Sequence, residues 1–129
     1  MVKEQLTDAM IDAGAELIRE LDENGVPVTT ALWLFDPEVN EWRLHLASPE
    51  VGTKGPIQMY TKVQHAMSRL GDTVSAVPFF AIRVFDANDE LARQLRTAIR
   101  TGPALSRIRF KRQVADDHFI EDALIYRAA

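Results

Sequence analysis

Cysteine is absent from the sequence, which has 129 residues. Without cysteine the protein forms no disulfide bond, has no catalytic thiolate and lacks the thiolate ligands of iron–sulfur clusters and structural zinc sites. The three histidines, His45, His65 and His118, are widely separated, and none has a second ligand at the four-residue spacing of a helical metal site. We therefore expect no metal ion and no other cofactor.

Long apolar runs are also absent. No stretch approaches the roughly 20 apolar residues that a helix needs to cross a bilayer. The first residues, MVKEQLTDAMIDAG, carry a charge every few positions and lack the apolar core of a secretion signal. These patterns predict a cytoplasmic protein without a membrane partner.

Recognisable catalytic motifs are missing as well. The sequence contains no Gly-x-Ser-x-Gly nucleophile motif, no Gly-x-Gly-x-x-Gly dinucleotide motif and no Gly-Lys-Ser/Thr phosphate loop. The carboxylates of Asp8, Asp12, Glu16 and Glu20 share one helical face, but no Glu-x-x-His partners exist for a metal site between helices. We interpret that face as solvent-exposed.

The composition is that of a small globular protein. Hydrophobic residues make up 47% of the sequence and charged residues 26%, and this length suits one hydrophobic core better than two. We expect a single domain that spans residues 1–129.

Hydrophobic periodicity and turn residues predict the element order α-β-β-α-β-α-β-β. The expected helices cover residues 6–23 and 56–70, with a third between a cap at Asp86 or Asn88 and a stop at Gly102, and the expected strands cover 28–35, 41–48, 78–85, 106–113 and 118–127. Residues 48–56, SPEVGTKGP, have the composition of a loop. Two hairpins joined through helices indicate an α+β fold with a mainly antiparallel five-stranded sheet and helices packed chiefly on one face.

The first predicted hairpin contains both tryptophans. If Asp36 faces Glu41 across the turn, strand alternation gives one wholly apolar face and one mixed face. The apolar face holds Ala31, Trp33, Phe35, Trp42, Leu44 and Leu46, and the mixed face holds Leu32, Leu34, Arg43 and His45. We interpret the aromatic residues as core packing rather than a binding platform. The mixed face is then the seat of a second helix layer or an interface.

Residues 91–112 are unusual because they contain seven basic residues and no acidic one. Spacing places Arg93, Arg96 and Arg100 on one helical stripe, and Arg107, Arg109 and Lys111 on one face of a strand. Three interpretations stay open: pairing with Glu121 or Asp122 on the next strand, contact with a protein partner, and salt-dependent binding of nucleic acid or another anion. The net charge of −4 argues against a dedicated nucleic-acid protein.

We expect a non-catalytic protein-interaction domain that binds another protein or a second copy of itself, because its acidic first helix and basic third helix are complementary. The alternative is an anion-binding or nucleic-acid-binding module that uses the basic segment 93–112. An enzyme is the third interpretation, with a site on the polar sheet face made of Arg43, His45, Arg83, Glu121 and Asp122. That interpretation requires a concave pocket there, with a histidine or carboxylate whose pKa is strongly shifted.

Overall fold

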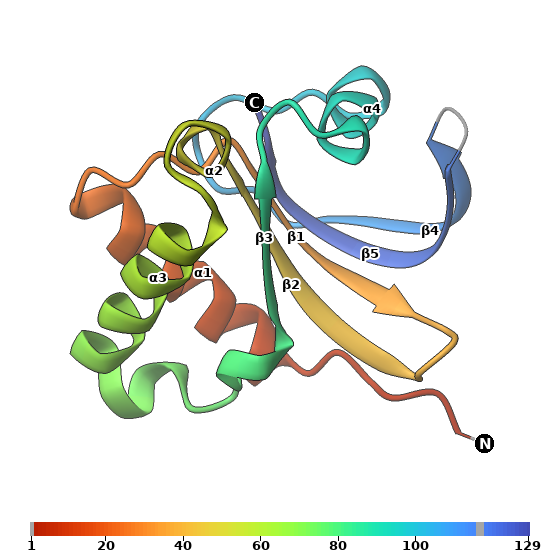
Figure 1. The fold of residues 1–129 in the computed structure, drawn as a ribbon. Coiled ribbons are helices and arrows are strands. Elements are labelled where there is room, and N and C mark those ends of the chain that lie inside the picture. Colours follow the sequence, from red (N-terminus) through yellow and green to blue (C-terminus); the bar gives the residue numbers. More distant parts are fainter. Residues whose placement is uncertain (1, 116–117) are drawn as a thin grey trace.

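Five strands form one mixed sheet at the centre of the protein, in the order β3-β2-β1-β5-β4 (Figure 1). The computed structural model describes residues 2–115 and 118–129, with the backbone alone described at 113–115 and 118. The strands are β1 (Thr30–Asp36), β2 (Glu41–Ser48), β3 (Ile82–Asp86), β4 (Ile108–Ala115) and β5 (His118–Ala128). The β2–β3 pair is parallel, and the other three pairs are antiparallel. The predicted α+β fold, its element order and its mainly antiparallel sheet are confirmed.

Helices cover the two faces of the sheet unequally. The helices are α1 (Asp8–Glu23), α2 (Pro49–Lys54), α3 (Pro56–Leu70), α4 (Glu90–Ala98), and the 3-10 helices η1 (Gly71–Val74) and η2 (Phe79–Ala81). Helices α1 and α3 pack on one face, and α4 lies on the other (Figure 1). Helices α2 and α3 form the crossover that the parallel β2–β3 pair requires. Within the described ranges, no helix is long and apolar enough to span a bilayer.

The β1–β2 hairpin has the predicted register. Asp36 pairs with Glu41, and Trp33 pairs with Leu44. Asn40 closes the turn with a positive φ of 52°, a conformation that asparagine tolerates better than most residues. The apolar face of the hairpin packs into the larger core beneath α1 and α3, as the alternation indicated.

A buried chain of hydrogen bonds ties α1 to the two central strands. The Trp33 indole N–H donates to the Tyr126 hydroxyl at 2.9 Å, and that hydroxyl donates to the Ile11 carbonyl at 2.5 Å. Burial raises the pKa of Tyr126 to about 12, so its hydroxyl keeps the proton that it donates. Gly14 makes this approach possible, because a Cβ there would lie 2.5 Å from the Tyr126 oxygen and 2.9 Å from the Trp33 nitrogen.

Residues 48–56 depart from the predicted loop, since most of them form α2. The Ser48 side chain caps this helix by accepting the Glu50 N–H at 3.2 Å, and Pro49 occupies its first turn. Glycine and proline suggested a loop, but a serine followed by proline and glutamate is also a helix start. The segment therefore begins the crossover to β3 as a helix.

The limits of α4 and β3 also differ from the prediction. Asp89 caps α4, rather than Asp86 or Asn88, and the backbone becomes extended at Ile99. Arg100 therefore lies beyond the helix and does not continue a stripe with the arginines of α4. Strand β3 begins only at Ile82, because η2 occupies residues 79–81.

We predict that Gly14→Ala lowers the free energy of unfolding by about 1–2 kcal/mol, because overpacking against Tyr126 and Trp33 outweighs the gain in helix propensity. Urea unfolding followed by circular dichroism measures this change. Gly102→Ala is the matched control, since a Cβ there meets no atom within 4 Å, and we expect it to stay within about 0.5 kcal/mol of the wild type. Equal stability of the two variants would contradict the close packing at Gly14.

Candidate functional site

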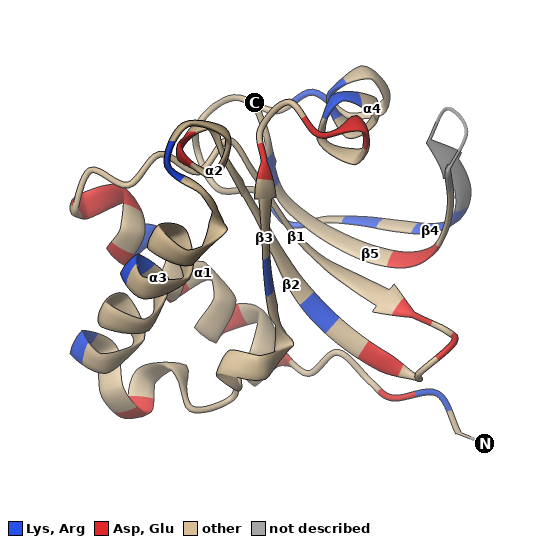
Figure 2. Cartoon of the chain, viewed as in Figure 1, with Lys and Arg blue, Asp and Glu red and all other residues tan. Residues whose placement is uncertain are grey.

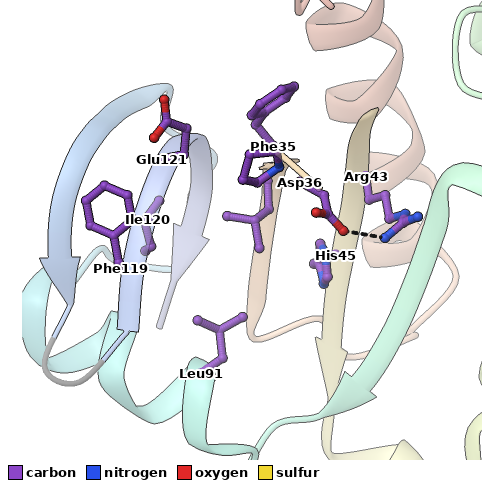
Figure 3. A pocket seen from close by; sticks show the side chains of 10 residues that line it. Phe35, Asp36, Arg43, His45, Leu91, Phe119, Ile120 and Glu121 are labelled. Carbon is purple, nitrogen blue, oxygen red and sulfur yellow. Dashed lines mark hydrogen bonds and ion pairs between the residues drawn. The ribbon is translucent and has the colours of Figure 1, made fainter. Parts of the chain in front are cut away.

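A pocket of about 280 Å³ opens on the face of the sheet that carries α4 (Figure 3). It lies where two strands diverge, because the β1–β5 pairing ends at Leu34 and Ala123. Beyond that point the end of β1 and the start of β5 form opposite walls, and Leu91 of α4 contributes to the lining. Helix α4 has only nine residues, so it covers part of this face and leaves the pocket open.

The walls of the pocket are mainly apolar. The apolar lining residues are Leu34, Phe35, Pro37, Leu91, Phe119 and Ile120. Ile120 is buried, whereas the Phe119 side chain is 64% exposed at the rim. The deeper residues belong to the smaller core cluster under α4, so the pocket is a continuation of that core toward solvent.

His45 is the main polar group within the pocket. It lies on β2, between Leu32 of β1 and Arg83 of β3, and its ring contacts Phe85 edge-on with centroids 6.0 Å apart. Burial, reinforced by the positive charges of Arg83 and Arg43, lowers the pKa of His45 to about 4. Among the described residues, no side chain forms a hydrogen bond with the imidazole. A neutral ring with one donor and one acceptor therefore faces the pocket.

An ion pair fixes the mouth of the pocket beside His45 (Figure 3). The Arg43 guanidinium donates to Asp36 at 2.9 Å and to Glu41 at 3.3 Å. All three residues belong to the β1–β2 hairpin, whose register brings them together. Glu121 of β5 lies on the opposite wall.

The structure brings together only part of the predicted polar cluster. Arg43, His45 and Glu121 line the pocket, and Arg83 lies beside His45. The Arg83 side chain is directed to the backbone, where it donates to the carbonyls of residues 80 and 82. Asp122 points to the opposite face of the sheet and binds Arg109, because neighbouring residues of a strand alternate between faces. The grouping of Glu121 with Asp122 was therefore wrong.

The predicted basic residues lie on α4, in the loop that follows it, and on or just before β4 (Figure 2). Arg93 and Arg96 belong to α4, and Arg96 donates to the Ala87 carbonyl at 3.0 Å. Arg100 lies in the following loop. Lys111 is exposed on β4, which pairs with β5 at the edge of the sheet.

Three residues of the basic segment form ion pairs within the domain, and one of them is Arg112, which lies 3.7 Å from Glu121 of β5. Arg107 lies 2.9 Å from Asp12 of α1, and Arg109 makes a bidentate contact with Asp122 at 2.7 and 2.6 Å. Cross-strand pairing, one of the three interpretations of this segment, thus accounts for Arg109 and Arg112. Binding of nucleic acid or another anion by the segment stays a prediction.

The apolar half of the pocket has no distinct signal in the sequence. Leu34 was assigned to the mixed face of the hairpin, but Phe119 and Ile120 had no distinguishing pattern in a strand that mixes acidic and apolar residues. Within the described part of the chain, no group of three or more His, Asp or Glu side chains is arranged to hold a metal ion.

Comparison of the chain with protein-family models, curated proteins and solved structures gives no match.

We predict that the free energy of unfolding falls as the pH decreases from 6.5 to 4, in part through His45. In this window the unfolded chain binds a proton at His45 that the folded protein does not bind, so acid favours unfolding. The loss attributable to His45 is up to about 3 kcal/mol. Urea unfolding at pH 7 and pH 4.5 should show a smaller difference for His45→Gln than for the wild type.

His65→Gln is the matched control, because His65 is exposed on α3, remote from the pocket. This variant should keep the pH dependence of the wild type. If His45→Gln also keeps it, the imidazole is not held neutral by the pocket.

Proposed function

We propose that this domain is a non-catalytic protein-interaction module, and that the pocket beside His45 receives one apolar side chain of a protein partner. The observation that carries the proposal is an open, mainly apolar pocket with a small number of fixed polar groups. Such pockets are typical sites of ligand recognition. The partner is another protein or a second copy of this chain.

The size of the pocket favours a single side chain over a whole small molecule. Its volume of about 280 Å³ is just below the range of roughly 300–1,000 Å³ that is typical of small-molecule sites. Protein interfaces instead concentrate much of their binding energy in one or a few apolar anchors that enter pockets of this kind. The exposed ring of Phe119 at the rim also fits an interface, where aromatic residues are enriched.

The polar groups of the pocket suit orientation of a partner. The neutral His45 ring offers one hydrogen-bond donor and one acceptor without requiring a counter-ion. Arg43 is already paired with Asp36, so the mouth of the pocket contains a compensated charge pair. A partner backbone group that follows the apolar anchor could bond to the ring or to the rim of this pair.

The low pKa of His45 argues against the enzyme interpretation, although a pocket with a strongly shifted histidine is present. A general base works best when its pKa is near the working pH. With a pKa of about 4, His45 is a weak base at neutral pH. Among the described residues, no carboxylate forms a hydrogen bond that would orient the ring. These properties suit binding better than proton transfer.

An NMR titration with N-acetylphenylalanine amide, a minimal aromatic anchor with a peptide backbone, tests the proposal. We expect saturable shifts at Leu34, His45 and Leu91 with a millimolar Kd, and Phe119→Ala should weaken this binding several-fold. The matched control is Phe80→Ala, which removes a ring that is 75% exposed and does not line the pocket. Absence of saturable shifts at the pocket, or equal weakening by both variants, would overturn the proposal.

A further inference from the structure

The N-terminal segment, residues 2–6, lies against the face of the sheet opposite the pocket described above. It leads into α1 and passes the end of the β1–β2 hairpin (Figure 1). Its hydrogen bonds are made with Asn40, Trp42 and Asp122, which belong to the hairpin and to β5, and Leu6 at its end packs against the larger core. The segment is thus bound like a ligand, through a small set of defined side-chain contacts.

The Asn40 and Trp42 side chains form hydrogen bonds with the backbone of this segment. The Asn40 side chain accepts the Glu4 N–H at 2.8 Å and donates to the Val2 carbonyl at 2.9 Å. The Trp42 indole N–H donates to the Glu4 carbonyl at 2.9 Å. The Asn40 side-chain amide thus satisfies both an N–H and a carbonyl of one extended segment. Such contacts recognise a peptide backbone whatever its side chains are. These contacts fit any segment that has an N–H at the position of Glu4.

A cage of two rings and a carboxylate binds the Lys3 side chain. The Lys3 ammonium lies 2.7 Å from the Asp122 carboxylate, 4.7 Å from the centre of the Phe35 ring and 5.7 Å from the Trp42 ring. Aromatic rings combined with a negative charge are a well-suited environment for an ammonium group, including a methylated one. The specificity of the site is therefore for lysine.

Arg109 holds the cage in place independently of Lys3. It makes a bidentate contact with Asp122, whose side chain is 1% exposed, and its guanidinium lies 5.5 Å from the centre of the Trp42 ring. Burial alone would raise the pKa of the Asp122 carboxylate. The hydrogen bonds from Arg109 and Lys3 outweigh burial and hold this pKa below its usual range. A carboxylate that is already oriented by arginine remains available when the lysine leaves.

The groove binds residues 2–6 without enclosing them. The Lys3 side chain is 43% exposed. Hollows of about 470 Å³ and 460 Å³ adjoin the segment on its two sides, one toward Lys111 and the other toward Phe80. The lysine end of this ion pair is open to solvent although Asp122 is buried, and residues 2–5 are exposed, so the segment is held by a few contacts at the surface of the domain.

We propose that this groove is a receptor site for an extended, lysine-bearing segment of a partner protein, and that residues 2–6 occupy it in the absence of that partner. The seated segment itself defines the chemistry of the ligand: an extended backbone with one ammonium group. The net charge of −4 favours approach of such a cationic segment. The groove and the His45 pocket lie on opposite faces of the sheet. This proposal is therefore independent of the function proposed above.

The test uses the full chain with two substitutions, Lys3→Ala and Glu4→Pro. The first empties the cage, and the second removes the N–H that Asn40 accepts. Neither substitution changes a residue of the groove. The probe is the acetylated peptide Val-Lys-Glu-Gln-Leu-Thr, which has the sequence of residues 2–7. Binding is followed at the Trp42 indole N–H by NMR. The fully buried Trp33 indole is the internal reference for folding.

We expect the double variant to bind this peptide about tenfold more tightly than the wild type, in which residues 2–6 compete. A peptide with methionine in place of lysine should bind roughly tenfold more weakly to the same variant. Lys3→Met alone, which keeps the backbone contacts, should show a smaller increase in affinity, and Gln5→Ala should behave as the wild type. The proposal is overturned if the released groove binds neither peptide, or binds both equally.

Discussion

The hydrogen bond between the Trp33 indole and the Tyr126 hydroxyl joins the two strands at the middle of the sheet, and its continuation to the Ile11 carbonyl joins both to α1. A buried indole N–H and a buried hydroxyl are costly unless both are satisfied. That requirement fixes the height of α1 over β1 and β5, and Gly14 provides the room. The packing of α3 beside α1 and the position of the N-terminal segment both follow from this placement.

The two faces of the sheet differ because their helices differ in length. The 16 residues of α1 and the 15 of α3 fill one face, whereas the nine of α4 leave part of the other uncovered. Divergence of β1 and β5 then turns the uncovered part into a pocket rather than a flat surface. His45 stays neutral there because it is buried beside two arginines. The pocket is therefore mainly apolar, with a few polar groups in fixed positions.

Local sequence predicted the parts of the structure that depend on local physics. The turn residues between Asp36 and Glu41 fixed the hairpin register, and alternation then assigned every aromatic residue of the hairpin to the core. Features that depend on contacts between residues far apart in the sequence could not be predicted from local patterns. Phe119 and His45 line the same pocket only because two strands diverge, and Lys3 meets Asp122 across 119 positions of sequence. Among local features, α2 was missed because serine, proline and glycine serve both loops and helix starts.

The position of β4 gives the basic segment a further consequence. β4 lies at one edge of the sheet, where unpaired backbone groups can recruit a strand of another molecule. Arg107 precedes this strand, Arg109 and Lys111 lie on it, and Arg112 interrupts its regular conformation with a φ of 46°. Long charged side chains and a local irregularity both oppose strand addition. The same residues therefore make the β4 edge an unfavourable template for the strand addition that leads to fibre-like aggregation.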